Sequence, residues 1–289
     1  MSAPRRSRRD DIEAKSPELA PFLALVALAQ AEARAPEWPA VAASLTLSTD
    51  PAPDAPLLAG AQLTVPAGAA RRVVTRLLDA AGQRAAARSS ALDPLALLET
   101  AVNHDAARLD PLAAALDLDA PALGPLAQLA AAPLLQACGR ALGPRVASGF
   151  AHGHCPICGA WPTMAEVRGL ERERHLRCGR CGGDWRIDAL LCLYCAQQDH
   201  RRLVALVPES HGEARKVDAC EECHGYVKIL ASLTAWPGDA VLLEDLDTVE
   251  LDLAAQARGY ARPAEPGRPL GVRLVAAPET PRGRWGMFS

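Results

Sequence analysis

The sequence predicts an α+β protein in which a helical N-terminal domain precedes two tandem cysteine-rich modules and a C-terminal helix. Three observations carry this prediction. Before residue 150 the apolar residues are mostly Ala and Leu, and aromatic residues make up only 4% of the chain, which favours helix over sheet. Eight of the nine cysteines fall between Cys155 and Cys223. Over the same stretch the chain changes to short β-like runs punctuated by glycine.

Composition and charge limit the class of protein. With 289 residues, 49% of them hydrophobic and 22% charged, the chain can bury a full core without being stabilised by disulfides or metal ions. Its formal net charge of −3 argues against a protein built mainly to hold nucleic acid or an anionic membrane. The longest apolar candidate, residues 22–29, is much shorter than the roughly 18 to 20 residues that cross a bilayer, so we expect no membrane insertion.

Residues 1–16 are expected to form a disordered basic arm. Arginines within residues 5–9 precede the apolar stretch, which is the pattern of a twin-arginine export signal. Acidic residues at positions 10–13 interrupt that pattern, and no clean cleavage site follows. We therefore expect a cytoplasmic protein, in which thiols stay reduced and clustered cysteines are more often metal ligands than disulfides.

Residues 17–150 are predicted to form the helical domain. Ser16 and Pro17 fit the N-cap and first position of a helix, and Asp93-Pro94 fits a second helix start. Residues 36–67 are rich in Pro and Asp and are expected to be mostly loop. Apolar residues at helical spacing predict further helices near 69–81, 94–102 and 121–142.

Residues 151–236 are predicted to form two tandem ribbons, 151–190 and 191–236. Each copy contains a Cys-x-x-Cys knuckle, a strand, a turn, a strand, a second knuckle and a last strand. The copies are offset by 37 residues at the first knuckle and 42 at the second, so only the hairpin length differs. Residues 237–262 are predicted to be a C-terminal helix, and residues 263–289 an irregular tail.

The cysteine spacing points to metal binding. A two-residue gap lets both sulfurs of a tight turn face one ion, and two such turns supply the four thiolates that suit tetrahedral Zn²⁺ or mononuclear iron. Separations of 19 and 24 residues between knuckles are typical of zinc ribbons and rubredoxin-like sites. We predict two such sites, each holding one iron or zinc ion, with ligands Cys155, Cys158, Cys178 and Cys181 in the first and Cys192, Cys195, Cys220 and Cys223 in the second.

Three alternatives stay open for these cysteines. A cross-brace would join the first knuckle to the third. Either quartet has a spacing that a four-cysteine iron–sulfur cluster accepts. The Cys155-Pro-Ile-Cys158 motif also fits thioredoxin-like redox chemistry, although no βαβ context surrounds it.

Other reactive side chains have structural interpretations. Cys138 lies on an apolar helix face and is expected to be a buried core residue. His154 and His224 flank knuckles and are expected beside the ligands rather than among them. Aromatic residues near the sites are expected to fill small cores, with a partner-binding surface as the alternative; they are Trp161, Trp185, Tyr194 and Tyr226.

The motifs of common enzyme classes are missing from the sequence, which contains no G-x-S-x-G, P-loop or dinucleotide fingerprint. Closed four-sulfur sites leave no coordination position for a substrate, so we do not expect an enzyme. Zinc ribbons often bind nucleic acid, but residues 152–230 contain 11 Lys and Arg against 11 Asp and Glu. A phosphate-binding module would be clearly basic.

Residues from about His154 to Arg262 resemble the FdhE family, the formate dehydrogenase accessory proteins. The resemblance rests on the four knuckles in this order, on Cys220-Glu-Glu-Cys223-His-Gly-Tyr226-Val-Lys-Ile-Leu230, and on the ending Gly259-Tyr260-Ala261-Arg262. It implies a cytoplasmic, non-enzymatic factor that active formate dehydrogenase requires and that contacts the catalytic subunit of the respiratory enzyme during maturation. It also implies that the eight cysteines hold two iron ions of rubredoxin type, or zinc in their place.

Two other functions fit tandem ribbons. A rubredoxin-like electron-transfer protein would need iron and a reversible potential. A zinc-ribbon nucleic-acid-binding protein is disfavoured by the charge balance of the ribbon segment.

Overall fold

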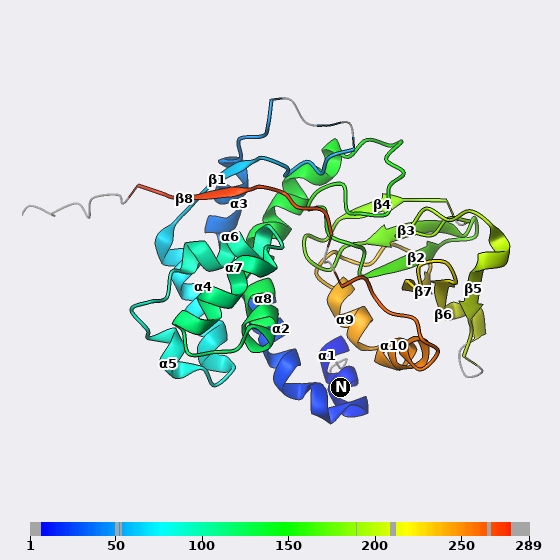
Figure 1. Ribbon diagram of the computed structural model, residues 1–289, viewed down its shortest axis with the longest axis horizontal. Coiled ribbons are helices and arrows are strands. Elements are labelled where there is room, and N and C mark those ends of the chain that lie inside the picture. The colour runs from blue at the N-terminus through cyan, green and yellow to red at the C-terminus, as the bar shows by residue number, and fades with distance from the viewer. Residues whose placement is uncertain are drawn as a thin grey trace, which may run out of the picture.

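The structure, a computed structural model, describes residues 7–49, 52, 54–188, 190–208, 212–264 and 267–278. It confirms the α+β class, because helices gather in one half of the molecule and a six-stranded sheet in the other (Figure 1). The division into domains stays a prediction. The helices of the first half are α1 Arg8–Lys15, α2 Ala20–Glu32, α3 Glu37–Ala43, α4 Ala67–Ala80, α5 Arg84–Ala87, α6 Pro94–Val102, α7 Ala106–Ala115 and α8 Ala120–Leu142.

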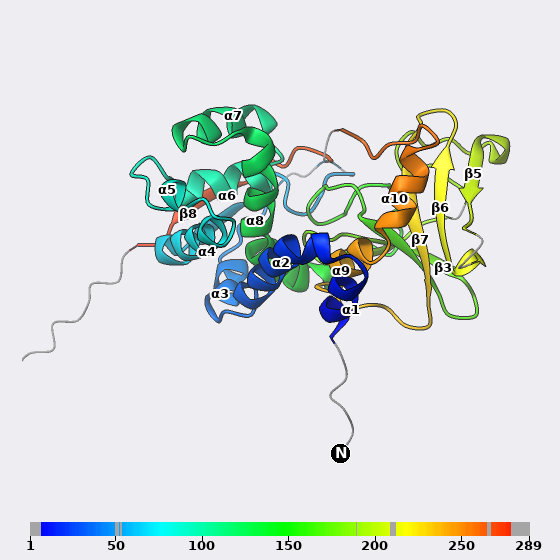
Figure 2. The ribbon, with the colours of Figure 1, turned by 90° about the horizontal axis from the view of Figure 1, so that it is seen from below.

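Helix α8 is the central element of the helical half, and α2, α3, α4, α6 and α7 pack against it (Figure 2). Asp119 caps its start by accepting a hydrogen bond from the Ala122 amide at 2.8 Å. Asp93 caps α6 in the same way, as the sequence predicted. The apolar face of α8 continues into the first cysteine module, so one hydrophobic core runs through both.

The N-terminal arm differs from its prediction. Residues 8–15 form α1 instead of a disordered segment, and residues 1–6 lie outside the described residues. Ser7 and Asp10 form a capping box at its start. Arg8 and Lys15 then reach the carboxylate of Asp247 at 2.9 Å and 2.6 Å. Because Asp247 lies near the other end of the chain, the local sequence pattern did not reveal this stabilisation.

The predicted loop 36–67 and the predicted irregular tail 263–289 both contain regular structure. The loop holds α3 and strand β1 Gln62–Val65, and the tail holds strand β8 Arg273–Ala276. The two strands pair in parallel, and β8 thereby returns the chain to the helical half (Figure 1). Each strand is four residues long and its partner is remote in sequence, so neither gave a local signal. Residues 265–266 and 279–289 of the tail lie outside the described residues.

The predicted repeat is present as two three-stranded antiparallel units in one sheet of order β4-β3-β2-β7-β6-β5. The parallel pair β2–β7 joins the units, with Ala165 opposite Ile229 and Arg168 opposite Ser232. The strands are β2 Met164–Arg168, β3 Glu173–Arg177, β4 Asp184–Arg186, β5 Leu203–Leu206, β6 Arg215–Cys220 and β7 Tyr226–Ser232.

Two short helices, α9 Val241–Leu246 and α10 Val249–Gln256, replace the predicted single helix 237–262 and cover one face of the sheet. The break between them has a cause in the sheet below. The fully buried Lys228 ammonium donates to the carbonyls of Asp245 and Thr248 at 2.6 Å and 3.3 Å, so these carbonyls face the sheet. Within the described part of the chain, none of the helices is long and apolar enough to cross a membrane.

Candidate metal centres

The structure brings the eight predicted cysteines together as two groups of four, and the pairing of knuckles is sequential. Within each group all four sulfurs lie within 4.8 Å of one another. The closest Sγ–Sγ distances are 3.5 Å between Cys155 and Cys181 and between Cys158 and Cys178. In the second group they are 3.6 Å for Cys192–Cys223 and 3.7 Å for Cys195–Cys220. A cross-brace would require a different grouping.

These distances fit a tetrahedral ion. Four sulfurs at about 2.3 Å from a central zinc stand about 3.8 Å apart, which is close to the separations in both groups. Each group can therefore hold one metal ion. That these residues ligate a metal remains a proposal. Elsewhere in the described residues, no other set of three or more His, Cys, Asp or Glu side chains is close enough to hold an ion.

The backbone of each knuckle presents its sulfurs through the same turn. In the first knuckle the Cys155 amide donates to the Ala160 carbonyl at 2.7 Å, and the Gly159 amide donates to the Cys155 carbonyl at 2.9 Å. The turn requires a left-handed residue after the second cysteine, and Gly159 and Gly182 supply it in the first site. In the second site Ala196 and His224 hold this conformation, at φ 59° and 55°, which costs more for residues with a Cβ.

The two groups differ in exposure. All four cysteines of the first group are at most 2% exposed. In the second group Cys192 and Cys220 are buried, whereas Cys195 and Cys223 are exposed. The first site is thus an interior site, and the second lies at the surface.

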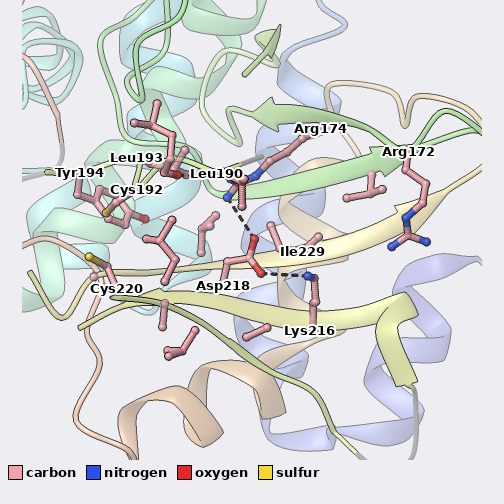
Figure 3. Close-up of a pocket in the computed structure, with 18 residues that line it drawn as sticks. Arg172, Arg174, Leu190, Cys192, Leu193, Tyr194, Lys216, Asp218, Cys220 and Ile229 are labelled. Carbon is pink, nitrogen blue, oxygen red and sulfur yellow. Dashed lines mark hydrogen bonds and ion pairs between the residues drawn. The ribbon is translucent and has the colours of Figure 1, made fainter. Parts of the chain in front are cut away.

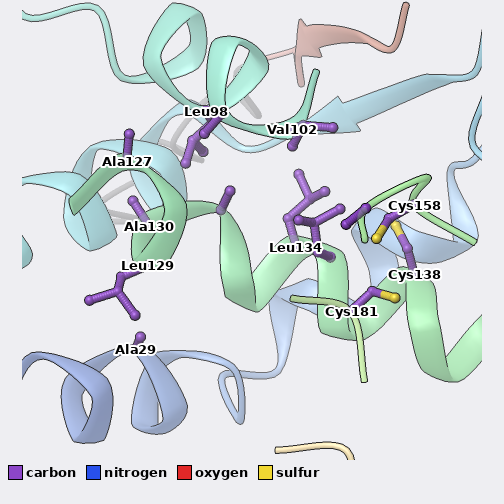
Figure 4. Close-up of a cluster of buried hydrophobic side chains, with 14 of the residues drawn as sticks. Ala29, Leu98, Val102, Ala127, Leu129, Ala130, Leu134, Cys138, Cys158 and Cys181 are labelled. Carbon is purple, nitrogen blue, oxygen red and sulfur yellow. The ribbon is translucent and has the colours of Figure 1, made fainter. Parts of the chain in front are cut away.

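The first site is built into the core of the helical half. Figure 4 shows Cys138, Cys158 and Cys181 together at the end of the cluster that contains Leu134. Cys138 is fully buried, as the sequence predicted, and burial raises the pKa of its thiol to about 12, which keeps it protonated. The next residue of α8 must be glycine, Gly139, because the helix passes so close to the Cys181 carbonyl that a Cβ would stand 1.9 Å from that oxygen.

The electrostatics of the first group favour a cation at its centre. Hydrogen bonds from the neighbouring thiols, first that of Cys155, lower the pKa of Cys178. Burial raises the pKa of Cys155, and contact with Cys155 raises that of Cys181. Four buried sulfurs therefore cannot all ionise without a compensating charge, and a divalent metal ion supplies that charge.

Sequence analysis missed His104, which supports the first site from the helical half. Arg180, inside the second knuckle, contacts the imidazole of His104 and donates to the Ala101 carbonyl at 2.6 Å. Burial, reinforced by Arg180, lowers the pKa of His104 to about 3, so the ring stays neutral and accepts the hydrogen bond. Nothing near His104 in the sequence indicates this role, because its partner is 76 residues away.

The histidines and aromatic residues near the knuckles are placed around the sulfurs. His154 is buried with its Nε2 3.1 Å from the Asp54 carbonyl, and burial lowers its pKa. His224 is exposed beside Tyr260. Trp185 fills the first module, and its indole donates to the His152 carbonyl at 3.0 Å.

Aromatic residues also link the modules to each other and to the helices above them. Trp161 and Tyr194 meet edge to face, with centroids 5.2 Å apart. The Tyr194 hydroxyl donates to the Tyr226 carbonyl at 2.9 Å, and the Tyr226 hydroxyl to Asp252 at 2.7 Å.

A buried ionic network fixes α9 and α10 on the sheet. The Lys228 ammonium is 2.8 Å from the Asp245 carboxylate and 2.6 Å from that of Asp252, and Arg262 binds the same two carboxylates. Burial opposes ionisation of Asp252, but Arg262 and Lys228 outweigh burial and hold its pKa below the ordinary value. This network gives structural roles to Lys228 and Arg262, which the sequence singled out only by resemblance.

Comparisons with known proteins agree with this architecture. Residues 190–266 match the family model described as FdhE, C-terminal domain. The FdhE homologue of Stutzerimonas stutzeri is 36% identical over 113 residues, which are 38% of this chain and 36% of that protein. The FdhE protein of Escherichia coli O127:H6 is 32% identical over 111 residues, which are 38% and 35%. The matched segments therefore span about a third of these relatives.

The fold match is more extensive. The crystal structure of the FdhE protein from Pseudomonas aeruginosa aligns with a TM-score of 0.51, covering 90% of this chain and 92% of that one. At 21% identity this likeness shows the fold alone. Together, the family model, the relatives and the fold confirm the resemblance to FdhE that the sequence predicted.

Proposed function

We propose that this protein is a cytoplasmic accessory factor that formate dehydrogenase requires for activity, and that it is not an enzyme. In this proposal it binds the catalytic subunit during maturation through the part of the fold that carries the two cysteine groups. The observation that carries the proposal is the pair of sequential four-sulfur groups on one sheet, the second of which lies in the segment that matches the FdhE C-terminal domain model.

The eight cysteines would hold two ions, iron of rubredoxin type or zinc. A bound ion would compensate the thiolate charge and join the two knuckles of each group. Sulfur occupies every position of a tetrahedral site, so a substrate would find no vacant coordination position. This supports a binding role over catalysis.

A rubredoxin-like electron-transfer function is the second candidate, and the surface position of Cys195 and Cys223 favours it. A zinc-loaded protein distinguishes the accessory function from electron transfer, because zinc has no redox chemistry at a thiolate site. Restoration of formate dehydrogenase activity by zinc-loaded protein would support the accessory role. Restoration by iron-loaded protein alone would support electron transfer. The balanced charge of residues 152–230 gives no support to nucleic-acid binding.

The direct test is an anaerobic affinity purification from the native organism, together with a deletion strain. The catalytic subunit of formate dehydrogenase should co-purify with the wild-type chain, and its activity should be lost in the deletion strain. A chain in which Cys155 and Cys192 are both replaced by serine should fail to restore that activity. Full formate dehydrogenase activity in the deletion strain would contradict the proposal.

A further inference from the structure

Two cavities adjoin the cysteine modules, and the charges of the larger one are met within the chain. This cavity, of about 320 Å³, lies on the sheet beside Cys192 and Cys220 (Figure 3). Asp218 stands between two of its cations, 3.2 Å from Lys216 and 3.4 Å from Arg174. A carboxylate of the chain itself therefore already faces these cations.

The smaller cavity, of about 190 Å³, lies where the helical half meets the first module. Helices α2 and α8 form its apolar walls, and Figure 4 shows Leu129 of α8 facing Ala29 of α2. Ala29 and Ala132 each extend only a methyl group into the space between the helices. Gly179 of the second knuckle and side chains near the start of α9 complete the lining. The cavity is thus concave, mainly apolar and built from four separate segments, as small-molecule sites are.

The lining contains a buried amide oxygen that is not hydrogen-bonded. The Oε1 atom of Gln128 has no partner among the described residues. The neighbouring amide of Gln30, in contrast, donates to the Asp239 carbonyl at 2.8 Å. A buried acceptor without a donor costs free energy, so native structures pair such atoms with protein groups or with bound molecules. The cavity therefore offers an acceptor to a ligand that carries an N–H or O–H group.

The charged groups of the lining favour a neutral ligand. Arg180 binds the Ala101 carbonyl at 2.6 Å and the His104 ring through its terminal nitrogens, and only its buried Nε lacks a partner. Arg180 lies inside a knuckle of the first group, so four thiolates around a divalent ion would offset its charge. The Asp239 carboxylate is 42% exposed and lies 3.6 Å from the Arg34 guanidinium. Neither charge requires a counter-ion inside the cavity.

The volume of the cavity limits the size of the ligand. An apolar cavity of about 150 Å³ takes up benzene. A cavity of about 190 Å³ therefore fits a molecule somewhat larger than benzene, such as a bicyclic aromatic ring.

We propose that this cavity binds a small neutral molecule that is mainly apolar and carries a hydrogen-bond donor for Gln128. Burial of the apolar part against α2 and α8 supplies the affinity. The hydrogen bond to Gln128 supplies selectivity, because an analogue without the donor leaves the buried oxygen unpaired. The ligand lies against the knuckle at Gly179 without taking a coordination position. The inference does not rest on the proposed function.

The first test titrates the ¹⁵N-labelled, full-length, metal-loaded chain with indole and with benzofuran, which has the same shape but no N–H donor. Indole should shift the backbone amides of residues 128–132 and 179–180 saturably and bind about five- to tenfold more tightly than benzofuran. In Gln128→Leu this preference should disappear, while benzofuran affinity stays within twofold of wild type. No saturable shifts with indole, shifts confined to other residues, or an unchanged preference in Gln128→Leu would overturn the inference.

A second test fills the cavity. Ala132→Phe places a ring in the space between the helices and should weaken indole binding at least tenfold. Its matched control is Ala141→Phe, which adds the same ring to an exposed alanine of α8 and should bind indole within twofold of wild type. Indole binding by Ala132→Phe as tight as that of wild type would place the ligand elsewhere and overturn the inference. If Ala132→Phe does not fold, the Gln128→Leu comparison decides alone.

Discussion

Replacing Gly139 by alanine tests whether the first cysteine group and α8 form one packed unit. A Cβ at this position would stand 1.9 Å from the Cys181 carbonyl oxygen and 2.9 Å from its carbon. Both neighbours are backbone atoms of a knuckle, so no flexible side chain can move aside. Bringing the oxygen to about 3.4 Å would require the helix and the knuckle to separate by about 1.5 Å.

A glycine-to-alanine substitution elsewhere in α8 is expected to change stability in the opposite direction. Alanine is preferred over glycine in a helix by about 1 kcal/mol. At Gly124 the new Cβ would meet only the Leu109 Cδ2 atom at 3.4 Å, which is an ordinary contact with a side-chain end. Gly124→Ala should therefore leave stability unchanged or raise it. At Gly139 the clash is with backbone atoms, so we take the upper part of the usual overpacking cost, about 2–3 kcal/mol; less the helix preference, the net loss of stability is about 1–2 kcal/mol.

The assay is thermal unfolding of both metal-loaded variants, followed by circular dichroism, with elemental analysis of the purified proteins. For a protein of this size the net loss lowers Tm by about 2–8 °C. The Gly139→Ala protein should also retain less metal than wild type, because Cys181 belongs to the first group. If Gly139→Ala raises Tm as Gly124→Ala does, the close packing of α8 on the knuckle is refuted.

Three further predictions concern other parts of the molecule. A colorimetric chelator should remove one metal equivalent rapidly and one slowly, because only the second group has exposed cysteines. Cys195→Ser should therefore abolish the fast phase of metal release, and Cys158→Ser the slow phase. Asp252→Asn should lower stability by about 3 kcal/mol in thermal melts, because it leaves Lys228 short of a buried partner. The stability difference between wild type and Asp252→Asn should be constant from pH 5 to 8. It should become smaller only below about pH 4, because the pKa of Asp252 is depressed and the stability that its carboxylate contributes is lost as the pH falls through that pKa. A smaller stability difference already near pH 6 would contradict this. Deleting residues from 267 onward should lower stability by about 3–6 kcal/mol, because two buried apolar side chains are lost with β8, and an unchanged Tm would argue against the β1–β8 pair.

The sequence was most informative where the determining interactions are local. A Cys-x-x-Cys turn fixes its own geometry, and the repeated order of knuckles and strands indicated which turns share a site; both cysteine groups were predicted for that reason. The cap at Asp93 is equally local, since the carboxylate binds amides two and three residues ahead. Resemblance to a family added the proposed partner, which no residue pattern could supply.

The features that sequence analysis missed depend on remote partners. Helix α1 is held by Asp247, β1 by β8, and His104 by Arg180, and none of these pairs shares a local pattern. The break between α9 and α10 has the same origin. The residues of both helices continue a helical pattern, but the buried ammonium of Lys228 requires carbonyls at the junction, and this demand arises only when the sheet lies beneath.

The unequal placement of the two cysteine groups bears on what their ions can do. The first group lies in the core shared with α8, so in the proposed metal-loaded protein the loss of its ion would open the interior and affect folding. The second group has two exposed cysteines, Cys195 and Cys223, so an ion held there would be close to solvent. In the proposed metal-loaded protein, exchange or oxidation of the second ion would therefore leave the interior of the fold intact. We expect the first repeat to depend on its ion for folding and the second repeat to tolerate the loss of its ion.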